Sequence, residues 1–448
     1  MNNFSKIFKA YDVRGKVGTE LTVELVEKIG KSFSIWLPEQ GPVAIGRDMR
    51  PDSERLAKAL IDGLTSQGRD VWDIGQVTSE MVYFATGKYD LAGGAVVTAS
   101  HNPGKDNGIK FCGYNARAIS IESGLAEIRD LVIKSNFSDQ DPRGKVTAKD
   151  LDEAWINHVL TFIDPSKLKP LKLAVDAGNG MAGKIFPKLE PYVPFIVTRM
   201  YFELDGTFPN HEANPLKFET LRDIIATIKK GGLDGGIAFD ADGDRGFLID
   251  EQGEVVTAGV VSAILAEYFL QKFPGANIVY DARNSRSVPE IIQAAGGKPV
   301  RSKVGHSLIK DMMRNVDAPF GGEGSGHFYF RDNWYADSGL IGMVIALQVL
   351  SGSGQKLSEL RKRYTHYAAI PETNFVVSDK DNVIAKLKKE FADSDQDTLD
   401  GITISLNDSS WFNVRPSNTE SLLRLNAEAR DRETLDRLVK RISSLINT

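Results

Sequence analysis

The segment Asp240-Ala-Asp242-Gly-Asp244-Arg245 places three carboxylates at alternate positions directly after an apolar run. Three carboxylates this close repel one another without a cation, and Mg²⁺ prefers oxygen ligands. Gly243 permits the tight turn that a loop of this kind needs. A calcium EF-hand is disfavoured, because its sixth loop position must be glycine and here is Arg245. The segment predicts a magnesium site, with a solvated acidic turn as the alternative.

A serine and a histidine, Ser100 and His101, follow a second apolar run in the segment Thr98–Pro103, and Lys110 lies a short distance beyond. The serine is not the nucleophile of a hydrolase elbow, because the chain contains no Gly-x-Ser-x-Gly. Taken alone, the segment is typical of a Ser-x-x-Pro turn. Beside a metal loop elsewhere in the chain, a hydroxyl that carries a phosphoryl group is the competing interpretation.

Glu323, Ser325 and His327 alternate in a glycine-rich segment, so one face of the backbone presents a carboxylate, a hydroxyl and an imidazole. These donors and acceptors suit a hydroxyl-rich ligand, although a plain polar loop has the same composition.

The segment Arg415–Glu420 joins a guanidinium to two hydroxyls and an amide around a turn, which is what a phosphate dianion requires. An ordinary turn is the alternative. The groups are those of Arg415, Ser417, Asn418 and Thr419.

A glycine pattern, Gly178-Asn-Gly180-Met-Ala-Gly183, matches the dinucleotide fingerprint, with Glu203 about twenty residues further on. It nearly matches a phosphate-binding P-loop as well, but Ile185 stands where Ser or Thr must meet magnesium. A glycine pattern alone is weak support for either, so a structural turn between a strand and a helix is favoured over a nicotinamide site.

The elements that must position these groups recur three times as short apolar runs alternating with amphipathic stretches, a pattern typical of parallel α/β layers. In each copy the third run ends in one of the first three motifs. Ligands of such sheets bind beyond the carboxyl ends of strands, so we expect these three ends to meet in one cleft. The runs are at 42–45, 71–74 and 94–97, at 171–175, 194–198 and 235–239, and at 277–280, 298–304 and 318–320.

From about Tyr367 the pattern changes to strand candidates too close together for helical crossovers, at 402–406, 410–414 and 421–425, with a helix before and after them. The sequence therefore predicts an α/β protein with three similar mixed α/β domains around a central cleft plus a smaller C-terminal α+β domain.

The composition agrees with a chain of 448 residues in three or four domains. A net charge of −5 gives no general attraction for nucleic acid or a membrane surface. The single cysteine, Cys112, excludes an intramolecular disulfide framework and a cysteine-cluster zinc site, which fits a reducing cytoplasm. With no signal-like N-terminus and no apolar stretch long enough to span a bilayer, we expect a cytoplasmic protein. We also expect a monomer.

Together, in this order and spacing, the motifs resemble those of the α-D-phosphohexomutase superfamily, most closely its bacterial phosphomannomutase/phosphoglucomutase branch. The resemblance runs from Lys9-Ala-Tyr-Asp-Val-Arg14-Gly to Arg415–Glu420, essentially the whole chain. It implies a phosphoserine-bearing domain, a metal-binding domain, a sugar-binding domain and a phosphate-binding domain, which we place at 1–147, 148–252, 253–366 and 367–448.

By this resemblance Ser100 is the phosphoserine, and a phosphoserine oxygen completes the Mg²⁺ site of the three aspartates. The other expected roles are grouped by chemistry. The positive charges that neutralise the transferring phosphoryl group are those of Arg14, Lys110 and Arg245. The candidates for proton transfer are His101, Lys110 and His306, with Tyr11 close to the same centre. The sugar is contacted by Arg283, Glu323, Ser325 and His327, and the phosphate that is not reacting is bound by Arg415, Ser417, Asn418 and Thr419.

The implied reaction moves a phosphoryl group between C1 and C6 of small-molecule hexose phosphates through a hexose 1,6-bisphosphate, with Mg²⁺ and glucose 1,6-bisphosphate as activator and intermediate. Asn418 favours the mannose/glucose branch over phosphoglucosamine mutases. Gly324 and Arg283 depart from the branch pattern, which has methionine and lysine there. Because one intermediate must bind in two orientations, we expect activity on both glucose and mannose phosphates. A phosphoglucosamine mutase, a noncatalytic sugar-phosphate sensor and an NAD-dependent oxidoreductase built on Gly178–Gly183 are the alternatives.

Overall fold

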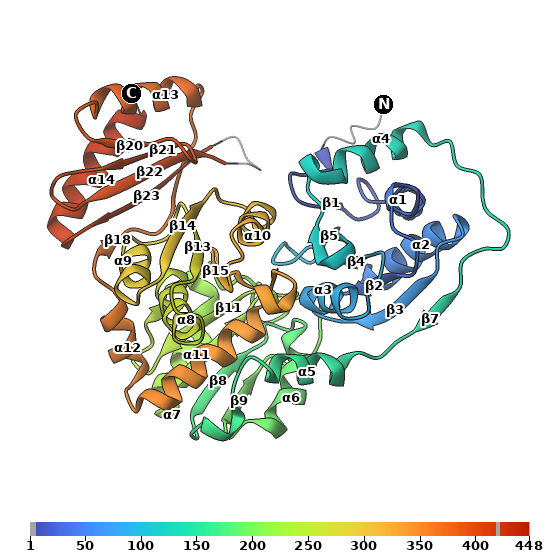
Figure 1. Ribbon diagram of the computed structural model, residues 1–448, viewed down its shortest axis with the longest axis horizontal. Coiled ribbons are helices and arrows are strands. Elements are labelled where there is room, and N and C mark those ends of the chain that lie inside the picture. The colour runs from blue at the N-terminus through green and yellow to red at the C-terminus, as the bar shows by residue number, and fades with distance from the viewer. Residues whose placement is uncertain (1–5, 418–421, 448) are drawn as a thin grey trace. The chain divides into compact units, whose positions relative to one another are not determined.

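The computed structural model describes residues 6–417 and 422–447, which form two compact units (Figure 1). The first unit takes in the chain up to Thr257 together with Ser325–Ser358. The second takes in Ala258–Gly324 and the chain from Glu359 onward.

The first unit begins with a mixed sheet in which β4, β2 and β3 are parallel, while β5 is antiparallel to both β4 and β1. Its strand order is β1 (Val13–Lys16), β5 (Asp106–Gly113), β4 (Gly93–Val97), β2 (Val43–Arg47), β3 (Val71–Gln76) and β7 (Val146–Ala148), with β6 (Arg117–Ala118) beside β5. The accompanying helices are α1 (Val23–Trp36), α2 (Ser53–Ser66), α3 (Ser79–Lys88) and α4 (Ala126–Lys134).

Helices α1 and α2 approach each other closely because glycines face each other at their contact. A Cβ on Gly30 would lie 2.4 Å from the carbonyl oxygen of Leu60, and one on Gly63 would lie 2.1 Å from that of Glu27. Their apolar faces, with Phe33 of α1, enter the buried core of this sheet. The same core fixes β4, whose residues are all buried and whose end leads to the Ser100 segment.

A second mixed sheet of the first unit has β10, β8 and β9 parallel and β11 antiparallel to β10. Its order is β12 (Val255–Val256), β11 (Gly246–Asp250), β10 (Gly235–Phe239), β8 (Lys172–Asp176) and β9 (Ile196–Met200). Its helices are α5 (Asp152–Leu160), α6 (Ala182–Leu189) and α7 (Arg222–Gly231). Strand β10 is buried along its whole length, as its apolar sequence predicts.

Each of these two sheets uses its motif to join a parallel strand to an antiparallel neighbour. The Ser100 segment connects β4 to β5, and the Asp240 segment connects β10 to β11. The antiparallel strands were not anticipated, because hydrophobic periodicity shows a strand but not the direction of its neighbours. Because β5 is antiparallel to β4, Lys110 on β5 lies beside Val96 on β4, the strand whose end leads to Ser100.

The remaining part of the first unit contains the β16–β17 pair (Phe328–Phe330 and Ala336–Asp337) and helix α11 (Gly339–Ser353). Helix α11 is apolar and largely buried. In the described residues no single helix is long and apolar enough to cross a bilayer. Helices α11 and α12 (Leu357–Tyr364) reach the required length and apolar composition only when they are taken together, and the chain bends by 104° between them.

The second unit contains the parallel strands β14 (Lys298–Ser302), β13 (Asn277–Asp281) and β15 (Phe320–Gly322), with α8 (Ala258–Lys272), α9 (Ser287–Ala294) and α10 (His306–Asn315). An antiparallel sheet follows, in the order β18 (Ala368–Ala369), β23 (Leu423–Ala429), β22 (Trp411–Pro416), β21 (Ile402–Ser405) and β20 (Asp395–Asp397), with β19 (Thr373–Phe375) also on β23.

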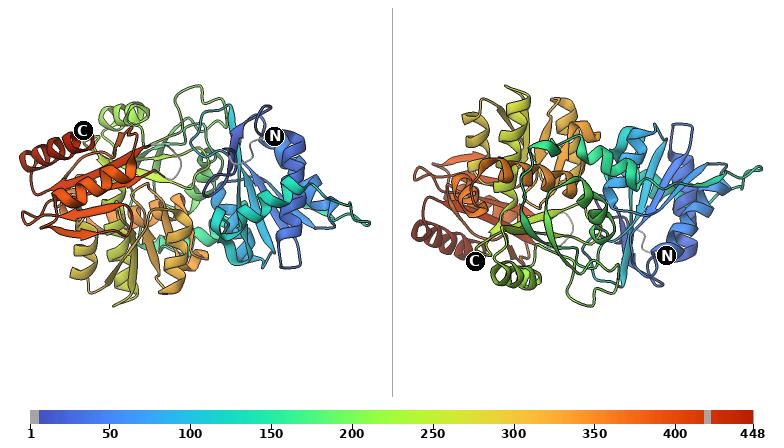
Figure 2. Two further views of the ribbon diagram at one scale, coloured as in Figure 1. Left: turned by 90° about the horizontal axis from the view of Figure 1, so that it is seen from above. Right: turned by 90° about the horizontal axis from the view of Figure 1, so that it is seen from below.

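Helices α13 (Lys380–Glu390) and α14 (Arg432–Asn447) pack on this last sheet through one apolar core. In Figure 2 the orange and red strands lie against the red helix that ends at the C-terminus. Three α/β domains and a final α+β domain confirm the predicted fold class.

Candidate active site

Ser100 begins the site at the carboxyl end of β4. It is 2 % exposed and has a φ of 50°, in the left-handed region that a residue with a side chain rarely adopts. Its N–H donates to Thr98 Oγ1 at 2.9 Å. A strained backbone at a buried serine is stable only if the surroundings impose it.

Arg50, which the sequence analysis did not single out, imposes it. The guanidinium donates to the carbonyl oxygens of Ser100 and Asn102, both at 2.6 Å, and to those of Pro103 at 2.8 Å and Asp106 at 3.1 Å. Its Nε donates to the buried Asp48 at 3.1 Å. The clue in the sequence is an arginine three residues beyond the end of the apolar strand β2, where a buried charge must have partners.

The three aspartates of the metal loop are also buried, and one carboxylate oxygen from each lies within 4.8 Å of the others. Gly243, at φ 76°, makes the turn. The buried atoms Asp242 Oδ1 and Asp244 Oδ1 have no hydrogen-bond partner among the described residues. Asp244 Oδ1 has only the longer ion-pair contacts of His327 Nε2 at 3.6 Å and Arg245 Nε at 3.7 Å. Buried carboxylate oxygens left without hydrogen bonds fit a hard cation, so all-oxygen ligation of Mg²⁺ by this group agrees with the chemistry of its donors.

The serine and the metal loop meet directly. Ser100 Oγ donates to Asp240 Oδ2 at 3.1 Å, while Arg245 donates to Ser100 Oγ at 2.9 Å and to Asp240 Oδ2 at 2.8 Å. Burial raises the pKa of Asp240 to about 7, against the opposing effect of Arg245. The charge of Asp240 therefore depends strongly on the cations around it.

Lys110 is the second cation of the loop. Its Nζ donates to Asp242 Oδ2 at 2.7 Å and to Asp244 Oδ2 at 2.5 Å. Burial lowers the pKa of Lys110, but the two carboxylates raise it further, and the result lies well above its usual value. A protonated lysine suits charge neutralisation or proton donation; with these neighbours it does not have the depressed pKa that a lysine base needs.

His101 and Arg14 complete the surroundings of Ser100. His101 Nδ1 lies 3.3 Å from Ser100 Oγ and also contacts Arg245. Arg14 donates to the carbonyl oxygen of Ala99 at 3.0 Å. Burial, and then the positive charges of Arg245 and Arg14, lower the pKa of His101 well below its usual value, so this imidazole is neutral near pH 7.

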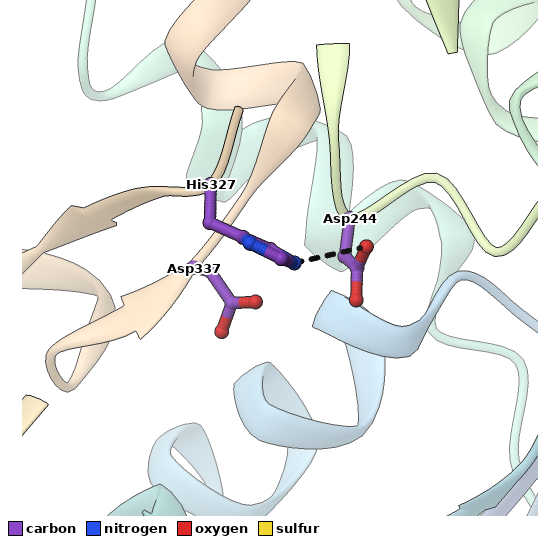
Figure 3. A group of neighbouring side chains, drawn as sticks. All are labelled: Asp244, His327 and Asp337. Atoms are coloured by element: carbon purple, nitrogen blue, oxygen red, sulfur yellow. Dashed lines mark ion pairs between the residues drawn. The ribbon is translucent and has the colours of Figure 1, made fainter. Parts of the chain in front are cut away.

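His327 reaches the same centre from the glycine-rich segment (Figure 3). Its Nε2 lies 3.6 Å from Asp244 Oδ1, and its Nδ1 lies 2.9 Å from Ser325 Oγ. Asp244, His327 and Asp337 form a second group that could hold a metal, sharing Asp244 with the first. Because Mg²⁺ prefers oxygen and the second group offers a nitrogen, the three aspartates fit this ion better.

In the second unit, Arg283 fixes the carboxylate of Glu323. It donates to Glu323 Oε1 at 2.8 Å and to Asp281 Oδ2 at 2.7 Å. A Cβ on Gly324 would lie 3.4 Å from Arg283 Cβ, so the side chain absent at 324 would lie beside this arginine. The two departures from the branch pattern are therefore neighbours in space.

Arg415, 2 % exposed, donates to Glu372 Oε2 at 2.7 Å, and Arg424, opposite it in the β22–β23 register, donates to Glu372 Oε1 at 3.2 Å. The N–H of the buried Ser417 donates to the carbonyl oxygen of Leu422 at 2.9 Å.

The remaining predicted residues are less informative. Asn418 and Thr419 lie outside the described residues. Tyr11 precedes β1 in the first unit, and His306 opens α10 in the second. Their roles stay predictions.

The glycines of Gly178–Gly183 are required by close backbone packing, so the motif needs no bound dinucleotide to account for it. Gly178–Gly183 does lie between β8 and α6, but a Cβ on Gly180 would lie 2.6 Å from the carbonyl oxygen of Ala241, and one on Gly183 would lie 2.2 Å from that of Phe202. The N–H of Met181 donates to the same Ala241 oxygen at 2.8 Å. Gly180 lets this turn pack against the metal loop, and Gly183 lets it pack against the segment that follows β9, which is the structural role favoured from the sequence.

Comparison with known proteins covers nearly the whole chain. Models of the phosphoglucomutase/phosphomannomutase alpha/beta/alpha domains I, II and III match residues 5–139, 153–253 and 260–367, and the C-terminal domain model matches residues 372–445.

Among curated relatives, the "Phosphohexose mutases" protein of Xanthomonas campestris pv. campestris (strain B100) is 41% identical over 444 residues, 98% of each chain. The phosphomannomutase of Salmonella montevideo is 40% identical over 460 residues, 100% of each. A crystal structure of a phosphoglucomutase/phosphomannomutase family protein from Burkholderia thailandensis superposes with a TM-score of 0.90 at 31% identity, covering 98% of this chain and 96% of that one.

With the four domain models in order along the chain, relatives matched over their full length and Ser100 beside an acidic cluster, the chain belongs to the α-D-phosphohexomutase superfamily, in the phosphoglucomutase/phosphomannomutase family, and is a phosphohexomutase.

Proposed function

We propose that this phosphohexomutase moves a phosphoryl group between C1 and C6 of glucose and mannose phosphates through phosphorylated Ser100 and a hexose 1,6-bisphosphate. The observation that carries the proposal is the contact of Ser100 Oγ with Asp240 Oδ2 at 3.1 Å, because it joins a hydroxyl able to carry phosphate to a cluster able to hold a cation.

We assign the metal to Asp240, Asp242 and Asp244. The buried Oδ1 atoms of Asp242 and Asp244, which accept no hydrogen bond from the described residues, support this assignment, and the phosphate on Ser100 would add a further oxygen. When bound, Mg²⁺ supplies charge neutralisation to the transferring phosphoryl group.

The first transfer breaks the bond between Ser100 Oγ and phosphorus and forms a bond from phosphorus to a sugar hydroxyl oxygen. Negative charge spreads over the phosphoryl oxygens during this step, where positioned cations lower the barrier most. Arg245 and Lys110 contact the serine and the aspartates already, and Arg14 holds the carbonyl oxygen of Ala99, one residue before Ser100.

The attacking sugar hydroxyl must lose its proton as the new bond forms. We assign this proton to His101, whose lowered pKa leaves the ring neutral and able to accept it. His306 is the second candidate from the sequence, and Tyr11 is expected close to the reacting centre. Lys110, protonated beside its two aspartates, is suited to return a proton to the leaving oxygen.

The second transfer is the reverse of the first with the sugar turned round. Ser100 Oγ takes the other phosphoryl group of the bisphosphate, and the sugar leaves as the isomeric monophosphate. We assign the sugar contacts to Arg283, Glu323, Ser325 and His327, and the idle phosphate to Arg415, Ser417, Asn418 and Thr419. The fixed Glu323 carboxylate and the buried Arg415 guanidinium support these roles.

Conversion of a panel of hexose 1-phosphates tests the proposal. Glucose, mannose and glucosamine 1-phosphates are incubated with Mg²⁺ and a trace of glucose 1,6-bisphosphate, and ³¹P NMR follows the 6-phosphates. We expect conversion of the glucose and mannose compounds. Conversion of glucosamine 1-phosphate alone would favour a phosphoglucosamine mutase, and binding without conversion would favour a sensor.

Monomeric state and cytoplasmic location stay predictions.

A further inference from the structure

Helix α3 contacts the metal loop through a residue that nothing in the sequence singles out. Ser79, its first residue, donates its hydroxyl to Asp242 Oδ2 at 2.5 Å, and its N–H donates to the carbonyl oxygen of Asp242 at 3.1 Å. Both residues are fully buried and are 163 positions apart in the chain. Side chain and backbone of one aspartate are thus held by one serine.

This contact decides which way the Asp242 carboxylate points. Oδ2 accepts from Ser79 and, at 2.7 Å, from Lys110, whereas the buried Oδ1 has no hydrogen-bond partner among the described residues. Rotation of the carboxylate would exchange the two oxygens and break both hydrogen bonds. The hydroxyl of Ser79 therefore fixes Oδ2 and leaves Oδ1, which has no hydrogen-bond partner in this part of the chain, as the oxygen that Asp242 can offer to a cation shared with the other two aspartates.

We propose that Ser79 is a positioning residue of the metal centre, which orients Asp242 for the divalent cation. The proposal rests on the cation site assigned under the proposed function, but not on the reaction. Groups that hydrogen-bond to a metal ligand fix its orientation, and their loss typically weakens metal affinity about 10–100-fold.

The serine is well placed for this role because its neighbours immobilise it. A Cβ on Gly243 would lie 2.9 Å from Thr78 Cγ2, so the residue before Ser79 packs on the turn of the loop. The residue after it, Glu80, is fully buried and hydrogen-bonded to the Ser338 side chain and the Leu340 backbone at the start of α11. A fixed donor loses little entropy when it holds a carboxylate.

The arrangement also favours the charge that the loop must carry. Helix α3, of 10 residues, begins beside Asp242, since the N–H of its first residue donates to the Asp242 carbonyl oxygen, and the positive end of a helix dipole stabilises a nearby negative side chain. Removing the Ser79 hydroxyl leaves this dipole and Lys110 in place. The substitution therefore tests orientation of the carboxylate rather than its charge.

Metal affinity measured without substrate is the direct test. Calorimetric titration with Mg²⁺, and Mn²⁺ binding followed by electron paramagnetic resonance, would compare the wild-type protein with Ser79→Ala, Ser79→Thr and Thr86→Val. Thr86 is the matched control, since it is a fully buried hydroxyl of the same helix that donates to the Val82 carbonyl oxygen at 2.8 Å.

We expect Ser79→Ala to weaken affinity for both ions about 10–100-fold, Ser79→Thr to restore most of it, and Thr86→Val to leave it unchanged. At saturating Mg²⁺ the KM of Ser79→Ala for hexose 1-phosphate should equal that of the wild type. Wild-type metal affinity in Ser79→Ala would overturn the proposal, as would an equal loss in Thr86→Val, which would show a general effect on α3.

The two proposals fail separately. Turnover by the wild type with unchanged affinity in Ser79→Ala overturns the role of Ser79 and leaves the reaction intact. Serine-dependent metal binding in a protein that converts no hexose phosphate supports Ser79 and overturns the reaction.

Discussion

Ser100 Oγ donates a hydrogen bond to Asp240 Oδ2 at 3.1 Å although the two residues are 140 positions apart. Arg245 donates to both atoms, which ties the end of β4 to the end of β10. Two sheets of the first unit thus deliver a hydroxyl and a cation site to one point.

Replacing Asp242 with Ala should lower kcat at least about 100-fold, because the loss of a ligand should cost more than the loss of a group that supports one. The fold should survive, since the substitution also relieves repulsion among three buried carboxylates. Turnover against Mg²⁺ concentration and thermal unfolding are the measurements, with the exposed Asp130→Ala as control. An unchanged Mg²⁺ dependence would count against this loop.

Arg50→Lys should lower kcat about 10-fold or more with little change in KM. Lysine keeps the charge but cannot reproduce the planar set of donors that holds the Ser100 loop. Carbonyl oxygens left without donors should also cost about 1–3 kcal/mol of unfolding free energy. Arg55→Lys, on the exposed face of α2, is the control for steady-state kinetics and urea unfolding. Full activity in Arg50→Lys would show that Ser100 keeps its conformation without the clamp.

Arg415→Ala should raise KM for hexose 1-phosphate about 10–150-fold, the equivalent of about 1.5–3 kcal/mol for a charge-assisted contact. The exposed Arg430→Ala removes the same charge from the end of β23 that lies away from Arg415 and should leave KM unchanged. Initial-rate kinetics with saturating Mg²⁺ separates KM from kcat. Equal KM values for the two variants would show that Arg415 does not bind the substrate phosphate.

The His211–Asp176 pair should make stability depend on pH. His211 Nε2 lies 3.0 Å from Asp176 Oδ2. Burial lowers the pKa of His211, but the hydrogen bond and charge of Asp176, together with the Glu212 backbone and the charge of Asp223, raise it by more, so the net shift is upward. A raised folded-state pKa stabilises the protein fully below the unfolded value of about 6.5 and loses that contribution as pH rises through the folded value.

Thermal unfolding of the wild type and His211→Asn between about pH 5 and pH 9 measures this effect. The stability advantage of the wild type should be largest at the acid end and shrink above neutrality. A difference that stays constant or grows with pH would mean that His211 is not protonated in the folded state.

The sequence predicted the strands that carry the motifs closely, because buried central strands are continuous apolar runs. The run at Gly235–Phe239 coincides with β10, and the run at 94–97 lies within β4. It did not predict β5, which interrupts its apolar residues with Asn107 and Lys110. That strand matters to the site, because it carries Lys110 to the aspartates.

The reacting groups could be found from residue type, but the residues that hold them could not. Ser100 and the three aspartates stand out because hydroxyls and crowded carboxylates imply chemistry. Arg50 and Ser79 have ordinary local sequences, and their importance comes from partners at least 50 positions away. Only the folded chain shows that Arg50 meets the Ser100 carbonyl and that Ser79 meets Asp242.

The decisive measurement is the phosphorylation and turnover of wild-type protein and Ser100→Ala with glucose 1,6-bisphosphate, glucose 1-phosphate and Mg²⁺, read by intact mass and a coupled glucose 6-phosphate assay. The wild type should carry one phosphoryl group, mapped to Ser100, and turn over, whereas Ser100→Ala should carry none and lose almost all activity. Full activity in Ser100→Ala, or no turnover by the wild type, would refute transfer through this serine.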